Sequence, residues 1–449
     1  MNRNSGVKIL REKYPVFEYS SFSYKKKAKS LVISFLFKIR PDIVFEPVLE
    51  IKNVDNFENI ENFIFHLGLI EMLSYWKVTC SPLIKIKAGS LNQKQINWWK
   101  NLLIKGLGEF FYQNDIDFKE EDFVRIESAG KKLFQYDKVG HKDRYLILNG
   151  GGRDSVVSLE FLKELKKQTK ILMLNPTQAQ LAVTRVSGVD NPIIVKREID
   201  KRLLDLNQKG YLNGHTPFSA YLSFLSILCS KLFDYKYIIS SNERSSNEGN
   251  LEFKGEKINH QYSKSFEFEK SFRQYAKENL SDDIEYLSLL RPLYEIQISR
   301  IFSNYKQYFG AFKSCNRGQK TNSWCGKCPK CLSIFISLYP FVGEGQAEII
   351  FGKNLYKDTD LVGLLGEISG EGENKPFECV GTFEEILTGL YLSSKKAGEQ
   401  LKELPLLEFA VSEILPKYNM EEIQERIING WDDENFLPGK IVTTLKNNV

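Results

Sequence analysis

Three consecutive glycines, Gly150, Gly151 and Gly152, lie between a strand-like run and a helix-like run of the chain. Glycines let backbone N–H groups converge on one point without side chains in the way. The N-terminus of the following helix adds partial positive charge at the same point. We therefore expect an anion site at residues 150–155, against the alternative of a tight strand-to-helix turn that is merely rich in glycine.

Three phosphate-binding motifs can be compared with this stretch. A Walker A loop ends in Gly-Lys-Ser/Thr, and a dinucleotide fingerprint needs a glycine where this chain has Ser155. The pyrophosphate loop, Ser-Gly-Gly-x-Asp-Ser, fits residues 150–155 with glycine in place of the first serine. In this pattern we expect Ser155 to cap the helix and to donate to a phosphate oxygen. We expect Arg153 to add positive charge, and Asp154 to cap the helix or to orient Mg²⁺.

Four of the seven cysteines lie close together, at Cys315, Cys325, Cys328 and Cys331. Four thiolates complete a tetrahedral Zn²⁺ site, and the two-residue spacings bring the sulfurs to one centre on a tight turn. We expect a structural Zn²⁺, because no ligand position is left open. An iron–sulfur cluster is the alternative, since it also takes four cysteines.

Further candidates lie in polar stretches of the chain. Ligands of open α/β sheets bind beyond the carboxyl ends of the strands, where such loops lie. His215 and His260 can act as a general base or as a phosphate donor, with a hydrogen-bonded loop histidine as the alternative. Arg244 can hold an anionic group, with a surface salt bridge to Glu243 or Glu248 as the alternative. Lys264 can also bind an anion, with helix-surface charge as the alternative. Cys379 lies outside the cysteine cluster and can exchange a proton as a thiolate, although a buried, inert cysteine is the commoner case.

Other residues of the same types are expected to have structural roles. His66 lies in an apolar helix and is expected in the core, while His141 lies in a charged linker and is expected in solvent. Cys80 and Cys229 fall in apolar surroundings and are expected to be structural. Arg291 is expected either to bind an anion or to carry charge on a helix surface.

The elements that position these residues change in character along the chain. Residues 14–52 alternate apolar and polar residues, which predicts three strands of an antiparallel meander. Residues 57–76 and 92–113 read as helices, and a strand is expected in SPLIKIKAG. From residue 144 short apolar runs alternate with helical stretches, which indicates a parallel sheet buried on both faces. These runs are RYLILN, KILMLN, PIIVKR and KYIISSN.

The predicted fold class is therefore α/β, with a doubly wound, mainly parallel sheet of the pyrophosphate-loop ATPase type. We expect an α+β N-terminal domain at residues 1–138, the α/β domain with the zinc site at 139–345, and a helical C-terminal region at 346–449. Hydrophobic residues make up 42% of the 449, enough for a sizeable core.

The charge and hydropathy of the chain limit the classes of partner that we expect it to bind. The chain carries 62 basic and 57 acidic residues without a long basic block, so no nucleic-acid partner is expected. No apolar run is long enough to span a membrane, and the N-terminus has no apolar signal segment. We expect a cytoplasmic protein, and the sequence does not decide its oligomeric state.

Longer stretches together resemble one family. They are FHLGLIEMLSYWK, GLGEFFYQN, NGGGRDSVVSLE, NGHTPFSA, NERSSNEGN, NHQYSKSFEFEKSF, LSLLRPLYEIQISRIF, the cysteine cluster and KPFECVG. The resemblance is to MurL, the UDP-N-acetyl-α-D-muramoyl-L-alanyl-L-glutamate epimerase family, and it is densest between residues 144 and 381. Residues 144–340 are also similar to the pyrophosphate-loop ATPases, in particular the 7-cyano-7-deazaguanine synthase branch, which pairs the glycine loop with a late zinc site.

What the resemblance implies is an ATP-dependent epimerisation. The terminal L-Glu of UDP-MurNAc-L-Ala-L-Glu becomes D-Glu through a carboxyl adenylate, and AMP and diphosphate are released. The implied cofactors are ATP, Mg²⁺ and structural Zn²⁺. Two alternatives remain: an adenylating ligase or nucleobase- or tRNA-modifying enzyme of the same superfamily, and a protein that only senses nucleotide.

Overall fold

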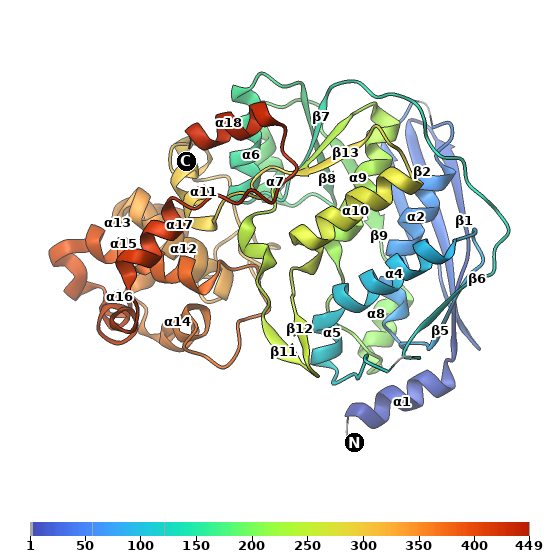
Figure 1. Cartoon of the computed structure of the whole chain (residues 1–449), viewed down its shortest axis with the longest axis horizontal. Coiled ribbons are helices and arrows are strands. Elements are labelled where there is room, and N and C mark those ends of the chain that lie inside the picture. The colour runs from blue at the N-terminus through green and yellow to red at the C-terminus, as the bar shows by residue number, and fades with distance from the viewer. Residues whose placement is uncertain (1–2, 56, 121, 449) are drawn as a thin grey trace.

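The computed structural model describes residues 3–55, 57–120 and 122–448, and it is built around one mixed, eleven-stranded sheet. The strand order is β13-β10-β7-β8-β9-β4-β2-β1-β5-β6, and β3 pairs with β2 (Figure 1). The strands of this sheet are β1 (Val16–Lys27), β2 (Ser30–Arg40), β3 (Ile43–Phe45), β4 (Val48–Lys52), β5 (Leu83–Ile86), β6 (Arg125–Ser128), β7 (Tyr145–Leu148), β8 (Thr169–Leu174), β9 (Ile193–Glu198), β10 (Tyr237–Ser240) and β13 (Glu285–Ser288). A separate hairpin pairs β11 (Leu251–Phe253) with β12 (Glu256–Ile258).

The five strands β7 to β10 and β13 form a parallel half-sheet, which confirms the four parallel strands predicted from sequence. The strand β13 was not anticipated. Strand β7 has β8 on one side and β10 on the other, so the chain order reverses next to β7. Such a switch point opens a crevice at the carboxyl ends of the strands, and the triple glycine follows β7 directly at this place.

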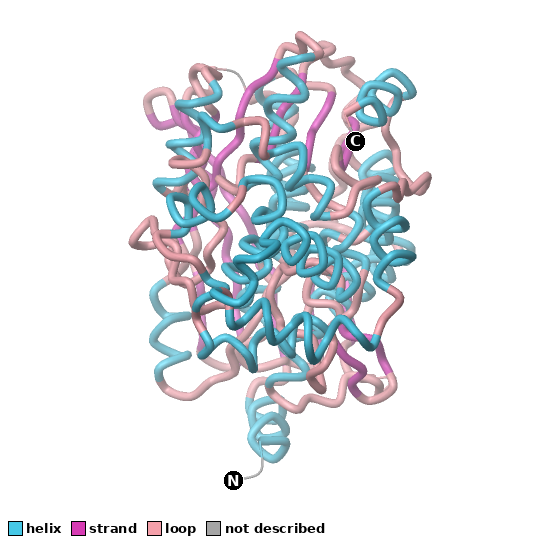
Figure 2. The backbone as a smooth tube through the Cα atoms, turned by 90° about the vertical axis from the view of Figure 1, so that its left-hand side faces the viewer, coloured by secondary structure: helices cyan, strands magenta, loops and turns pink. Residues whose placement is uncertain are grey.

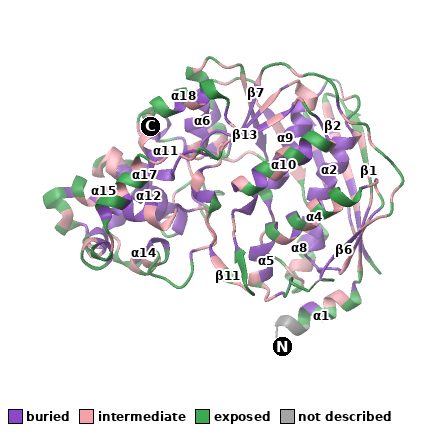
Figure 3. Ribbon diagram, in the orientation of Figure 1, coloured by how far each residue is buried: buried purple, intermediate pink, exposed green. Residues whose placement is uncertain are grey.

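Helices cover both faces of the parallel half-sheet. This is required because apolar side chains of its strands point to both faces. In β7, Leu146 packs in one hydrophobic core and Ile147 in the other, because successive side chains of a strand point to opposite faces. One core holds residues of α2 (Glu61–Glu71), α3 (Leu73–Trp76), α4 (Gln93–Gly106), α5 (Gly108–Gln113), α8 (Lys201–Gln208), α9 (Phe218–Phe233) and α10 (Phe266–Asn279). The other holds residues of α6 (Arg153–Glu164), α7 (Gln178–Ser187) and α11 (Glu295–Phe302). Figure 3 shows α9 and most of the parallel half-sheet as buried.

The N-terminal strands form the predicted antiparallel meander, but the expected third strand is divided into β3 and β4, which both pair with β2. Strand β2 pairs antiparallel with both β1 and β4, and its residues alternate between buried and half-buried. That alternation is typical of a sheet with one covered face. Strand β4 also pairs antiparallel with β9, so the sheet runs without a break past residue 138, the expected end of the N-terminal domain. The short helix α1 (Arg3–Lys13) stands apart from these layers in Figure 2.

The elements beyond residue 328 are helices, most of which gather on one side of the sheet, whereas the last one, at 439–447, is drawn apart from them (Figure 1). Its α-helices are α12 (Pro329–Val342), α13 (Glu344–Phe351), α14 (Val362–Ser369), α15 (Phe383–Ala397), α16 (Pro405–Phe409), α17 (Met420–Ile428) and α18 (Gly439–Asn447). The regular elements within residues 346–448 are thus all helices, and the helical part already begins at Pro329. Among the described residues, every helix is too short or too polar to cross a bilayer.

Candidate active site

A cavity of about 560 Å³ opens at the carboxyl ends of β7 and β8. Its lining includes five of the residues that the sequence singled out: Gly150, His215, His260, Lys264 and Cys379. Leucine side chains of the two strands, Leu148, Leu172 and Leu174, form part of its lining. A concave site of this size, apolar with a few convergent polar groups, is typical of a small-molecule pocket.

The glycine loop needs glycine at its second position for steric reasons, and its third position is closely packed. Gly151 has a φ of +76°, and a Cβ there would lie 2.7 Å from the backbone nitrogen of Gln180. A Cβ on Gly152 would lie 2.8 Å from the Ser314 hydroxyl oxygen. Gly150 is different, because a Cβ would meet only the Ser155 hydroxyl oxygen, at 3.6 Å, and Gly150 lines the cavity. The loop therefore keeps its first glycine open toward the cavity.

The expected cap by Ser155 or Asp154 is wrong. Helix α6 begins at Arg153, its N-cap is Gly152 with extended backbone, and no side chain caps it. Because the helix starts two residues earlier than expected, Ser155 lies in its first turn. The Ser155 hydroxyl oxygen accepts the N–H of Gly150 at 2.9 Å, so this side chain braces the loop.

Arg153 does not face the cavity, contrary to the expectation that it adds charge there. It is buried, and its guanidinium donates to Asp154 at 2.8 Å and to the Ser299 hydroxyl at 2.7 Å, with Glu295 at 3.3 Å. Burial by itself raises the pKa of Asp154, but the charges of Arg153 and then Lys330 outweigh it, and the net pKa is lowered. Asp154 thus remains a carboxylate at the start of α6.

Cys379 is held among cationic groups. Lys264 donates to the Cys379 sulfur at 3.1 Å, and His260 also hydrogen-bonds this sulfur. Nδ1 of His260 in turn contacts the carboxylate of Glu109, which lies on α5. Nδ1 of His215 lies 3.3 Å from the same carboxylate, and the two imidazole rings are 4.6 Å apart. One chain of contacts therefore links Glu109 to the thiol.

These contacts set the charges in the cavity. Burial by itself raises the pKa of Cys379, but the charges and hydrogen bonds of Lys264 and then His260 outweigh burial. The net pKa is lowered to about 6. Burial lowers the pKa of His260, whereas its hydrogen bonds to Cys379 and Glu109 raise it to about 9. Burial and the charge of His260 lower the pKa of His215 to about 4. At neutral pH the cavity therefore holds a thiolate, an imidazolium and a neutral imidazole.

Two arginines lie outside this cavity. The guanidinium of Arg244 stacks on the ring of Tyr294 and lies 3.5 Å from Asp432, instead of pairing with a neighbouring glutamate as the alternative reading had it. Arg291 is fully buried and pairs with Glu269 at 3.0 Å, so it is neither an anion site nor surface charge. Arg291 also donates to the Glu243 and Lys264 carbonyls, which fixes the backbone of both segments.

The remaining histidines and cysteines are structural. His66 is buried and bonded to Asn62 and Tyr275, and Cys80 and Cys229 are fully buried, all as expected. His141 was expected in solvent, but its side chain is only 3% exposed. It contacts Asp283 at 3.3 Å, because the linker lies against the edge of the sheet.

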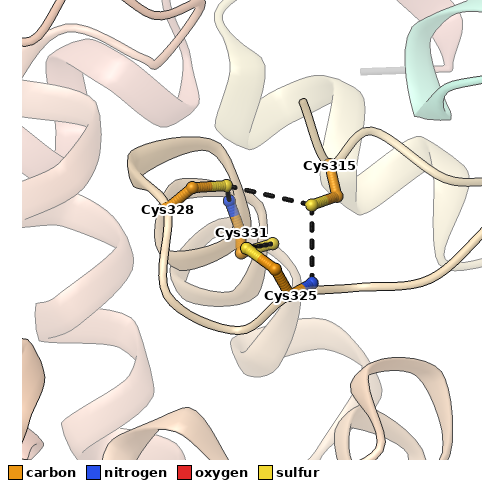
Figure 4. A group of neighbouring side chains, drawn as sticks. All are labelled: Cys315, Cys325, Cys328 and Cys331. Carbon is orange, nitrogen blue, oxygen red and sulfur yellow. Dashed lines mark hydrogen bonds between the residues drawn. The ribbon is translucent and has the colours of Figure 1, made fainter. Parts of the chain in front are cut away.

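The four clustered cysteines have the geometry that Zn²⁺ requires (Figure 4). Their sulfurs lie within 4.8 Å of one another, with Cys315 to Cys328 at 4.0 Å and Cys325 to Cys331 at 3.8 Å. A tetrahedral ion with bonds of about 2.3 Å to sulfur separates its ligands by about 3.8 Å. Backbone N–H groups donate to three of the sulfurs, which favours thiolates. The donor set therefore fits a closed, structural Zn²⁺ site.

The cysteine cluster also positions one wall of the cavity. Glu378, next to Cys379, accepts the backbone N–H of Lys330 at 3.1 Å and the side-chain amide of Asn316 at 3.2 Å. Lys330 stands between two of the cysteines, and Asn316 follows the first of them and lines the cavity. The segment that carries Cys379 is thus anchored to the turn that carries the clustered cysteines.

Sequence reasoning missed Glu109 and Glu378. Glu109 is 7% exposed and lies in the apolar stretch GLGEFFYQN, where a lone carboxylate needs a buried partner. A lone carboxylate in an apolar stretch was therefore the signal in the sequence that could have identified Glu109. Glu378 gave none, because its partners are a backbone N–H and an amide far away in the chain.

The fold and site together define an α/β protein with a largely apolar cavity, lined by a few polar groups, at a topological switch point beside a four-cysteine cluster. The chain belongs to the MurL family: the MurL N-terminal domain matches residues 8–289 and the MurL C-terminal domain matches residues 311–425. The family resemblance read from the sequence is confirmed.

Curated relatives carry the name UDP-N-acetyl-alpha-D-muramoyl-L-alanyl-L-glutamate epimerase. One from Xanthomonas oryzae pv. oryzae is 30% identical over 379 residues, which cover 83% of each chain. One from Micromonospora sp. is 32% identical over 353 residues and 78% of each chain. One from Salinispora tropica is 34% identical over 339 residues, or 74% of this chain and 73% of the relative. No solved structure matches.

Proposed function

We propose that this chain is an ATP-dependent epimerase of peptidoglycan precursor synthesis. It converts the terminal L-Glu of UDP-MurNAc-L-Ala-L-Glu to D-Glu and releases AMP and diphosphate. The names of the relatives support the substrate and the inversion. The observation that carries the chemistry is that Gly150, His260, Lys264 and Cys379 line one cavity.

ATP solves a kinetic problem in this scheme. Removing the α-proton of a free glutamate places a second negative charge beside the carboxylate. ATP caps that carboxylate with AMP, so that the neighbouring proton becomes acidic enough for a weak base. Residues 150–155 would hold the phosphates, supported by the open side of Gly150 and the start of α6. Asp154 is the carboxylate that would hold Mg²⁺.

In the proposed scheme Cys379 is the base. Its thiolate takes the α-proton, and a cavity with Lys264 and His260 provides positive charge beside the enolate oxygen. A proton from solvent water then adds to the opposite face of the carbon, and the Cys379 thiol returns its proton to solvent. Water finally cleaves the adenylate, which restores the carboxylate and releases AMP. His215 lies on the same wall as a neutral imidazole. Arg244 lies outside the cavity and receives no part in this chemistry.

The finer fold assignment is part of the same proposal. Residues 139–345 form a pyrophosphate-loop ATPase-like unit with a structural Zn²⁺, supported by the strand order around β7 and by the sulfur distances. Residues 1–138 and 346–449 flank it as two further domains. All seven cysteines are free, which suits the reducing cytoplasm.

The test is to incubate the purified protein with ATP, Mg²⁺ and UDP-MurNAc-L-Ala-L-Glu. AMP is measured by chromatography, and the chirality of glutamate is measured after acid hydrolysis. In D₂O the product should carry deuterium at the inverted carbon. Inversion at full rate without ATP would refute the scheme, and AMP formed only with guanine-type or tRNA substrates would favour the alternative enzyme class.

A further inference from the structure

A second cavity, of about 820 Å³, lies beside the first. The two share a wall, the segment Asn259–Ser265. Asn259, Tyr262 and Ser265 line the second cavity, whereas His260 and Lys264 line the first. The residue pair Gly108 and Glu109 repeats this arrangement, since Gly108 lines the second cavity and Glu109 contacts His260. One turn of backbone therefore separates the second cavity from the proposed proton-transfer groups.

The first cavity is too small for both reactants. A drug-sized ligand fills a pocket of roughly 300–1,000 Å³, so the 560 Å³ beside the glycine loop suit ATP and the reacting end of a second molecule. The nucleotide half of a UDP-muramoyl dipeptide needs its own volume nearby. The second cavity is larger, and within the described chain it adjoins the first.

The second cavity also has the chemistry of a nucleotide site. Four lysines line it, at Lys105, Lys119, Lys257 and Lys270, together with three glutamates, at Glu256, Glu267 and Glu434, so one positive charge is left in excess. Lys105 pairs with Glu267 at 2.5 Å, but no ion pair within the described residues engages the other three. Lysine ammonium groups are common ligands of phosphate. Three aromatic rings, of Phe118, Tyr262 and Phe266, line the same cavity and give a base a surface to stack on.

We propose that this second cavity binds the uridine diphosphate part of the substrate, with Lys119 and Lys257 at the diphosphate. This inference rests on the proposed function for the identity of the substrate. The muramoyl dipeptide would then extend past the Asn259–Ser265 wall, and its glutamate would reach Cys379. The uridine diphosphate and the ATP would occupy separate cavities.

The experiment measures binding of UDP, uridine and ATP by calorimetry. The test variant is Lys119→Glu/Lys257→Glu, and the matched control is Lys306→Glu/Lys402→Glu, which makes the same change of charge at exposed positions outside both cavities. We expect the Kd of UDP to rise at least tenfold in the test variant and less than twofold in the control. Binding of uridine should change less than that of UDP, and the Kd of ATP should stay within twofold.

Hydrogen exchange locates the site independently of the variants. UDP should slow exchange in residues 256–262, and UDP should compete with the peptide substrate but not with ATP. Equal UDP binding by the test and control variants, or competition between UDP and ATP, would overturn the subsite. These outcomes are separable from the proposed activity. Without inversion or AMP the epimerase proposal fails, while the UDP measurements still decide the cavity.

Discussion

Replacing Cys379 by serine tests the proposed base directly. The pKa of the thiol falls from an ordinary value of 9.0 to about 6 in this cavity, which corresponds to about 4 kcal/mol in favour of the thiolate. At pH 7 about nine in ten molecules then carry the thiolate, against about one in a hundred for an ordinary thiol. A serine hydroxyl stays protonated at this pH. General bases contribute about 10²–10⁴-fold, so we expect the epimerisation rate of Cys379→Ser to fall about 10³-fold.

The assay must separate proton transfer from adenylation. Exchange of labelled diphosphate into ATP reports the first step, and uptake of deuterium at the glutamate α-carbon reports the second. In Cys379→Ser the exchange should persist within a few-fold, because the serine preserves the size of the side chain and the glycine loop is untouched. The deuterium uptake should disappear. Inversion at the wild-type rate would refute the base, and equal loss of both steps would show that Cys379 acts in binding.

The pH profile carries the same reasoning. The thiolate forms as pH rises through about 6, and the imidazolium of His260 is lost as pH rises through about 9. We therefore expect kcat/KM to be bell-shaped with limbs near these values, which belong to the interacting pair as a whole. In Lys264→Met the loss of a positive charge raises the pKa of Cys379, so the acid limb should move to higher pH.

Three further predictions follow from the same contacts. In Glu109→Gln the pKa of His260 should fall, because the variant removes the carboxylate that raises it. The alkaline limb of the pH profile should therefore move to lower pH. An unmoved limb would show that Glu109 does not set the pKa of His260. Gly151→Ala should lower the free energy of unfolding by roughly 1–3 kcal/mol and weaken ATP binding, because its φ is +76° and Gln180 is close. Denaturant melts and calorimetry check this against Gly140→Ala, where a Cβ meets nothing within 4 Å. Metal analysis should find one zinc per chain, lost in Cys328→Ser and kept in His260→Ala. A second ion lost from His260→Ala would show that Glu109, His215 and His260, whose ligand atoms lie within 4.8 Å, hold a metal in place of a proton.

The parts of the site that sequence predicts are those in which local chemistry decides the structure. The glycine loop and the cysteine turn are each set by residues a few positions apart, and both appear where expected. Arg153 shows where local reasoning fails: its position beside the loop suggested an anion ligand, but Glu295 and Ser299, more than a hundred residues away, draw the guanidinium inward. The partner of His260 was equally out of reach, since Glu109 lies 151 residues earlier in the chain.

The cavity exists only where three distant parts of the chain meet. Helix α5 supplies Glu109, the parallel half-sheet supplies the glycine loop and the segment with His260, and the segment before α15 supplies Cys379. The continuous sheet fixes the first two relative to each other through the pairing of β4 with β9. The third is fixed by Glu378, which holds the Cys379 segment to the cysteine turn. The proposed zinc would therefore act on the thiolate only indirectly, because it would hold in place the cysteine turn on which the Cys379 segment rests.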